Sequence, residues 1–162
     1  MQKLILIFLL GLILVSWQAK ASPILGLCEP QEIQFFHCKT KKGSWANLCG
    51  TSSGGLQYRF GRSGKIALRY PENPAEGKEQ FLLARYFRFQ TNRIEVTFQN
   101  QAVSYTIFDY TEGKHRHAGL RVNNKGSESE IPCSAPFVSK LVELESVLDC
   151  DPDNALNGGV CR

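Results

Sequence analysis

The sequence predicts a mainly β protein: an antiparallel β-sandwich or barrel of about seven strands, stabilised by disulfides, with one helix near the C-terminus. Three observations predict it. Stretches in which apolar and polar residues alternate follow one another through the chain, separated by turn residues. A later stretch, 137–148, has the spacing of an amphipathic helix. Six cysteines, an even number, provide for disulfides between these elements.

The N-terminal segment, 1–21, is predicted to be a signal peptide. Lys3 precedes an apolar run from Leu4 to Val15, and Ala19-Lys20-Ala21 has the small-x-small pattern that signal peptidase cleaves. Cleavage leaves residues 22–162 as a single domain. The run is shorter than the ~20 residues of a membrane span, and no later run is long enough to be one. We therefore expect a periplasmic or secreted protein without a membrane span after cleavage.

The charge of the mature chain argues against nucleic acid as a partner. The full chain has 19 basic and 15 acidic residues, and the basic Lys3 and Lys20 leave with the signal peptide. The remaining charge of about +2 is too small for binding to a phosphate backbone.

Turn residues divide the first half of the mature chain into two predicted hairpins. The turns are Lys41-Lys42-Gly43 and Gly61-Arg62-Ser63-Gly64, and a loop with two prolines, 71–78, follows the second hairpin. The arms of the second hairpin alternate apolar with polar residues. The predicted strands cover 33–38, 45–49, 56–60 and 66–70.

The second half begins with a predicted central strand, 81–89, because this stretch is apolar on both faces. A tight turn is expected near Asn100-Gln101, and a polar loop over 111–116. Three further strands are predicted over 93–99, 103–107 and 118–122.

The last predicted element is a helix over 134–149. Ser134 can cap its start, and Pro136 suits its first turn. The tail, 151–162, is expected to be irregular. One helix face would carry Phe137, Leu141, Leu144 and Leu148.

The cysteines are interpreted as a disulfide framework, since no Cys-x-x-Cys pair indicates a metal or redox site. A continuous helix would hold Cys133 and Cys150 ~25 Å apart, beyond the ~7 Å between α-carbons that a disulfide allows. Cys38–Cys49 would close a hairpin and Cys150–Cys161 the tail. Cys28–Cys133 would then join the first strand to the helix.

No cofactor, metal or catalytic motif is expected. His115 and His117 lie near Asp109 and Glu112, which would suit a metal or a general base, but basic neighbours disfavour a cation and favour a solvated loop. The alternating carboxylates of 149–154 are similar to the first half of a calcium loop. Because the required glycine and glutamate are missing, a turn with local hydrogen bonds is favoured.

Basic and aromatic residues interleave along the middle strands and give the candidate binding surface. Arginines on adjacent strands could hold carboxylates or phosphates bidentately, whereas the alternative is an ordinary solvated sheet face. The expected partner is a protein with an acidic cleft or an anionic polymer of the cell envelope. The candidate arginines are Arg59, Arg62, Arg69 and Arg88.

An ordered set of segments along nearly the whole mature chain resembles a family of small exported bacterial proteins without an assigned function. This resemblance implies homology and export, but no activity. The segments are His37-Cys38-Lys39-Thr40, Leu56-Gln57-Tyr58-Arg59-Phe60-Gly61, Phe108-Asp109-Tyr110 and 150–157.

A weaker resemblance is to bacterial inhibitors of c-type lysozyme, which are small exported β-barrels. Phe36-His37-Cys38 is similar to their Tyr-x-Cys segment. Ser53-Gly54-Gly55-Leu56-Gln57-Tyr58 is similar to their Ser-Gly-x-x-Tyr loop, which enters the lysozyme cleft, but is one residue longer. The resemblance implies Ser53 as a binding residue.

The expected function is that of an exported, non-enzymatic binding protein of the bacterial envelope, either a lysozyme-type hydrolase inhibitor or a binder of an envelope ligand. Two alternatives remain open. One is an exported hydrolase that uses Asp109, Glu112 and His115 or His117. The other is a structural component of the envelope.

Overall fold

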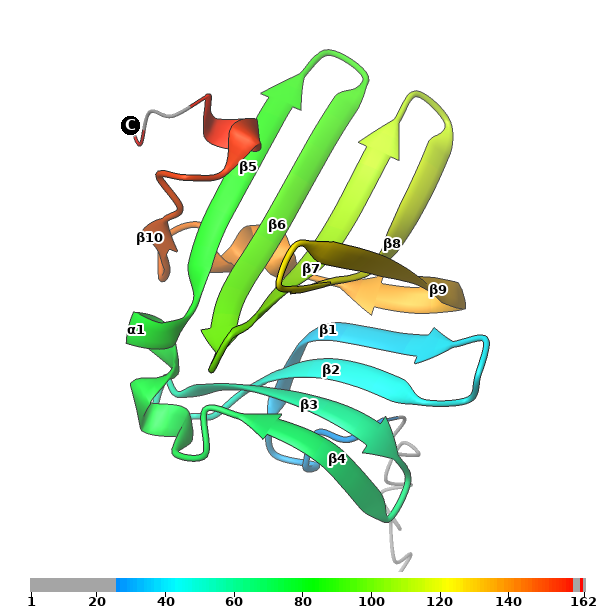
Figure 1. The fold of residues 1–162 in the computed structure, drawn as a ribbon, viewed down its shortest axis with the longest axis vertical. Helices are drawn as coiled ribbons and strands as arrows, with labels where there is room; N and C mark the ends of the chain where they lie inside the picture. Colours follow the sequence, from blue (N-terminus) through cyan, green and yellow to red (C-terminus); the bar gives the residue numbers. More distant parts are fainter. Residues whose placement is uncertain (1–25, 159–160, 162) are drawn as a thin grey trace, which may run out of the picture.

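A computed structural model describes residues 26–158 and Cys161. It confirms a mainly β protein, in which ten strands form one sheet in the order β10-β5-β6-β7-β8-β9-β1-β2-β3-β4 (Figure 1). The predicted signal peptide, 1–21, lies outside the described residues. None of the helices in the described part of the chain is long and apolar enough to cross a membrane.

Most of the observed strands are a few residues longer than the predicted ones. Short helical turns lie between β4 and β5 (η1, Pro74–Glu76; α1, Gly77–Gln80) and near the C-terminus (η2, Leu141–Leu144; η3, Ala155–Asn157). The strands are β1 (Ile33–Thr40), β2 (Trp45–Gly50), β3 (Leu56–Arg62), β4 (Lys65–Tyr70), β5 (Leu82–Arg88), β6 (Thr91–Asn100), β7 (Val103–Glu112), β8 (His115–Asn124), β9 (Ser127–Ser139) and β10 (Asp149–Cys150).

The sheet is open and curled, which corrects the predicted sandwich or barrel of about seven strands. In Figure 1 the strands β5–β8 stand upright and β1–β4 run across them. The strand β9 belongs to both groups, because 127–132 pair with β8 and 133–139 with β1. Through this corner strand the two groups of strands form one open sheet, in place of the predicted sandwich or closed barrel.

The predicted helix over 134–149 is wrong. Residues up to Ser139 continue β9, and only Leu141–Leu144 form a short 3₁₀ turn. Backbone pairing with β1 holds this segment extended, so the tertiary contact overrides the local pattern. Leu141, Leu144 and Leu148 are nevertheless buried in the core, as their spacing predicted.

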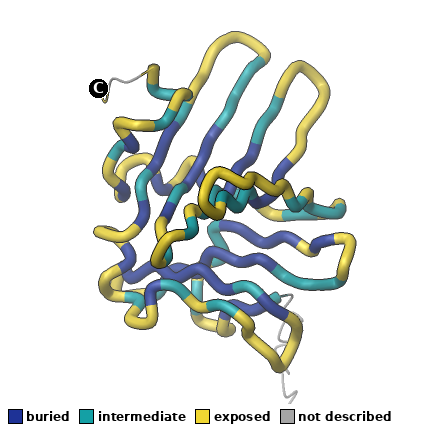
Figure 2. Tube along the Cα trace, in the orientation of Figure 1, coloured by how far each residue is buried: buried dark blue, intermediate teal, exposed yellow. Residues whose placement is uncertain are grey.

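The core lies between the two groups of strands, and its centre is aromatic. The ring of Phe98 on β6 lies 4.9 Å from those of Tyr70 and Tyr105, 5.0 Å from Tyr58 and 5.2 Å from Phe81. Figure 2 shows buried segments along the middle of the strands and exposed ones at the turns. The aromatic contacts therefore join β3 and β4 to β6 and β7.

The three disulfides correct two of the predicted pairs. Cys150–Cys161 is confirmed, but Cys28 pairs with Cys49, and Cys38 pairs with Cys133. In the β1–β2 hairpin Cys38 lies opposite Ala46, three residues from Cys49. Side chains alternate between the faces of a strand, so Cys38 faces the core and Cys49 faces away from it.

The C-terminal tail covers part of the outer edge of β5. The short strand β10 pairs with β5 in parallel, and the amide of Asp151 donates to the carbonyl of Leu83. The amide of Arg85 donates to Asn157 Oδ1 at 3.2 Å. The tail thus supplies partners for backbone groups that an edge strand would otherwise expose.

Candidate binding surface

The predicted binding residues do not form one surface. Arg59 is buried, whereas Arg62, at the β3–β4 turn, and Arg69, opposite Arg59 on β4, are exposed. Arg88 lies at the end of β5, and Ser53 in the turn between β2 and β3, with its Oγ 2.9 Å from Thr51 Oγ1. Of the predicted positions, only Arg88 has exposed aromatic neighbours.

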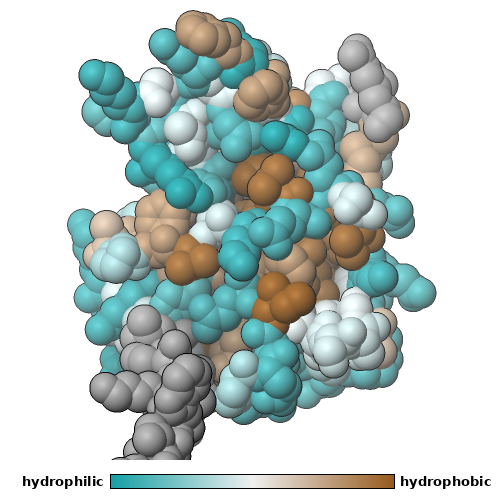
Figure 3. All heavy atoms as spheres, turned by 180° about the vertical axis from the view of Figure 1, so that it is seen from behind, coloured by the Kyte–Doolittle hydropathy of each residue, from teal (hydrophilic) through white to brown (hydrophobic). Residues whose placement is uncertain are grey.

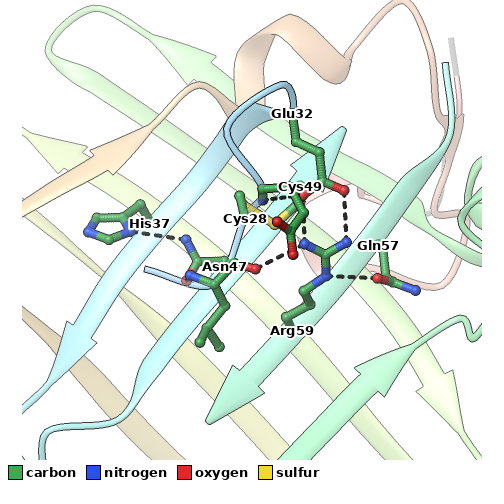
Figure 4. Close-up of a disulfide and its surroundings, with 9 residues drawn as sticks. Cys28, Glu32, His37, Asn47, Cys49, Gln57 and Arg59 are labelled. Carbon is green, nitrogen blue, oxygen red and sulfur yellow. Dashed lines mark hydrogen bonds and ion pairs between the residues drawn. A yellow bond between two sulfur atoms is a disulfide. The ribbon is translucent and has the colours of Figure 1, made fainter. Parts of the chain in front are cut away.

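Arg59 is a structural residue, because its guanidinium is enclosed by partners (Figure 4). It forms a bidentate ion pair with Glu32, at 2.6 and 2.7 Å, and both side chains are 7% exposed. It also donates to Gln57 Oε1 and to the carbonyl of Leu27. The network fastens the segment before β1 onto the outer face of β3.

We call this network around Arg59 and Glu32 the anchor. A second group of polar side chains lies next to it, on the side of β1. Asn47 Nδ2 lies 3.0 Å from His37 Nδ1, and Asn47 Oδ1 accepts from the amide of Leu27. Burial lowers the pKa of His37, whose ring stacks on that of Trp45. Gly26 has a positive φ of 107°, and a Cβ there would lie 2.6 Å from His37 Nδ1. The close contact explains a glycine at this position.

Three groups near this anchor have the proximity of metal ligands, namely Cys28, Glu32 and Cys49. The two cysteines are joined in a disulfide, and the carboxylate of Glu32 is held by Arg59. The two sulfur atoms and the carboxylate therefore already have bonding partners within the protein and are not free to bind an ion.

The residues of the hydrolase hypothesis lie on the β7–β8 hairpin, where 111–116 are mostly strand rather than the predicted loop. Asp109 is opposite Ala118 and faces away from His117, its carboxylate bound by Arg116 Nε at 3.0 Å and Nη2 at 2.7 Å. Glu112 forms an ion pair with Arg93. The two carboxylates thus point to opposite faces of the sheet.

In the acidic segment 149–154, Asp149 and Cys150 form β10, and residues 151–154 form a turn. The buried Asp151 accepts hydrogen bonds from Thr97 Oγ1 at 2.6 Å and from the amide of Asp153. The side chain of Asn154 accepts from the amide of Leu156. The bonds to the amides of Asp153 and Leu156 are the local hydrogen bonds that the turn interpretation predicts, and the bond from Thr97 adds a tertiary contact.

A polar cavity of about 400 Å³ lies on the outer face of β6–β8, beside the tail. At its base the buried Glu95 accepts from the hydroxyl of Tyr110, from Arg121 Nη1 at 3.1 Å and from Asn154 Nδ2 at 2.6 Å. Burial, with the hydrogen bond to Glu95, raises the pKa of Tyr110 to about 12. Each charged group at the base has a partner, so this cavity is built around an internal network.

We expect the ionisation of Tyr110 to be delayed to about pH 12, compared with pH 10 for an exposed tyrosine. Because its pKa is higher in the folded than in the unfolded chain, the related stabilisation is complete below pH 10. It is lost as the pH rises from 10 to 12. When tyrosinate absorbance is followed against pH, the ionisation step near pH 12 should be present in the wild type and missing in Tyr110→Phe. An unchanged titration curve for this variant would contradict the assignment.

The strongest candidate surface is the end of the β5–β6 hairpin. Phe87 and Phe89 are 71% and 88% exposed, and the guanidinium of Arg88 lies 5.8 Å from the ring of Tyr86. In Figure 1 this hairpin and β7–β8 project from the body at the same end. We define residues 86–89 and Lys114 as the hairpin tip. Figure 3 shows hydrophobic side chains among hydrophilic ones at this end.

The apolar pattern of 81–89 predicts a central strand, in which both phenylalanines would be buried. The structure corrects this interpretation, because β5 lies next to the edge of the sheet and only its first half is buried. The available signal was their position beside Gln90-Thr91-Asn92, a polar stretch that forms the turn and the start of β6.

Comparisons with protein-family models, with curated proteins and with solved structures find no match. The two family resemblances stay predictions.

Proposed function

We propose that this chain is an exported, non-enzymatic binding protein of the bacterial envelope that contacts its partner through the hairpin tip. The observation that carries the proposal is the exposure of Phe87 and Phe89 beside Arg88. Aromatic residues and arginine are the types most enriched among the residues that dominate binding energy. A large apolar side chain left in water on a projecting hairpin contributes little to the fold and is available to a partner.

Two features support export. Three disulfides join the six cysteines, and such bonds persist in oxidising compartments. The sequence also begins with the pattern of a signal peptide. The periplasm or the exterior of the cell is therefore the proposed location.

The binding role is favoured over the hydrolase because the candidate acids already have partners. Asp109 is held by Arg116 and Glu112 by Arg93. A general acid or base must reach the substrate within hydrogen-bonding distance, and these ion pairs would have to break first.

The proposed partner is anionic. Within the described residues Arg88 and Lys114 have no acidic neighbour in an ion pair, so their charge is available. An acidic cleft, such as that of a lysozyme-type hydrolase, and an anionic envelope polymer both fit this charge. The Ser53 loop that the inhibitor resemblance implies belongs to a separate turn.

The test is retention of the mature chain on immobilised c-type lysozyme, on peptidoglycan and on isolated envelope membranes. We expect retention on at least one of them, reduced about tenfold in Phe87→Ser/Phe89→Ser. The variant Ser53→Ala tests the inhibitor loop separately. The matched control is Ile66→Ser, which removes another exposed apolar side chain, on β4, and should bind normally. Failure of the wild type to bind any of them, or equal binding by the tip variant, would overturn the proposal.

A further inference from the structure

We propose that the hairpin tip binds the surface of an anionic phospholipid bilayer, with Phe87 and Phe89 in the interfacial layer and the basic side chains at the phosphates. This inference rests on the proposed function and names the partner of the same site. It follows from the shape, the charge and the residue types of the tip.

The two hairpin turns at this end form one unit. The amide of Gly113 in the β7–β8 turn donates to the carbonyl of Gln90 in the β5–β6 turn at 2.7 Å. Thr91 and Glu112 are also paired in the β6–β7 ladder. Both turns therefore end at the same level, and the tip is a convex double turn. A flat surface can meet both turns together, whereas a narrow protein cleft would admit only one.

The charge around the tip is positive. Segments 85–93 and 109–117 contain five basic residues and two acidic ones, a net charge of +3 with neutral histidines. The two acidic residues, Asp109 and Glu112, are both neutralised by arginines within these segments. A third arginine, Arg85, is paired with Glu145 outside these segments, so the uncompensated positive charge of the tip is that of Arg88 and Lys114. A surface rich in anionic lipids attracts such side chains, and salt screens the attraction.

The order of residue types along the tip also fits a bilayer. Phe89, the most exposed large hydrophobic side chain among residues 26–158, lies at the turn, and Arg88 precedes it directly. An arginine can extend its charged end to the phosphates while its aliphatic part follows an apolar neighbour inward. One shallow apolar contact binds membranes weakly, so combining it with basic charge is the common solution.

The test is sedimentation of the mature chain with vesicles. We expect binding to phosphatidylcholine vesicles that contain phosphatidylglycerol, and little binding to pure phosphatidylcholine. Phe87→Ser/Phe89→Ser should lower the partition coefficient roughly tenfold. Arg88→Gln/Lys114→Gln should lower it by about fivefold for each charge removed, with a correspondingly weaker dependence on salt.

The matched control is Arg62→Gln/Ile66→Ser, which removes one exposed basic and one exposed apolar residue at the β3–β4 turn and should bind as the wild type does. Phe89→Trp gives a second readout, since tryptophan emission should shift to shorter wavelength only with anionic vesicles. Soluble glycerol phosphate should not compete, because it offers the headgroup without the interface.

Three results would overturn the inference: absent vesicle binding, competition by glycerol phosphate, or tip variants that bind vesicles normally. If vesicles fail while lysozyme or peptidoglycan still retains the chain through the tip, the lipid inference is wrong and the binding function stands. If the tip variants behave as wild type on every surface, the proposed function itself is wrong.

Discussion

Replacing Arg59 by alanine should lower the free energy of unfolding by about 3–5 kcal/mol, because the carboxylate of Glu32 would remain buried without its partner. The ion pair is bidentate and both side chains are 7% exposed. The substitution also leaves Gln57 Oε1 and the carbonyl of Leu27 without this donor. Urea unfolding followed by circular dichroism would measure the loss.

The double variant Glu32→Leu/Arg59→Leu should recover most of this stability, since a buried pair replaced by apolar residues no longer leaves an isolated charge. Arg62→Ala, at an exposed position of the same strand, should change the stability by less than about 0.5 kcal/mol. If Arg59→Ala lowered the free energy of unfolding by less than about 1 kcal/mol, the ion pair with Glu32 would not hold the segment before β1 onto β3.

Removing the Cys38–Cys133 disulfide should cost about 4–5 kcal/mol, the largest loss among the three disulfides. The cysteines are separated by 95 positions, and a long closed loop restricts the unfolded chain most. The bond also fixes the corner strand β9 to β1, where the sheet changes direction. Cys38→Ala/Cys133→Ala should therefore unfold at a much lower urea concentration than the wild type.

The Cys150–Cys161 bond, with a separation of 11, is the control, and Cys150→Ala/Cys161→Ala should lose about 2–3 kcal/mol. Peptide mapping without reduction tests the pairing itself. A peptide that joins Cys38 to Cys49 would contradict the structure, as would a reversed order of the two stability losses.

The strands of both halves could be predicted from alternation and turn residues because these signals are local. The β3–β4 hairpin and the run from 93 to 107 show this, and only their ends moved. The segment 134–139 could not be predicted, since its partner β1 lies almost a hundred positions earlier. Leu141, Leu144 and Leu148 have helical spacing, yet a 3₁₀ turn and the bend after it bury all three.

The candidate site was harder to predict than the fold. Arg88 was identified by type, but Phe87 and Phe89 were interpreted as core because an apolar run does not reveal which of its residues are covered. Arg59 was expected at the surface, as most arginines are. Its partner Glu32 precedes it by 27 positions, in a segment that folds back only in the tertiary structure.

The tail that lies along β5 has a consequence for association between copies of the chain. An open sheet can grow by adding strands from another molecule, and polymers form when this addition repeats. Asp151 and Asn157 occupy hydrogen-bonding positions on β5 that an incoming strand would need. The Cys150–Cys161 bond closes this part of the chain on itself. Because the tail occupies these positions on β5, it blocks the addition of strands from another molecule, and so the growth of fibres, at that edge of the sheet.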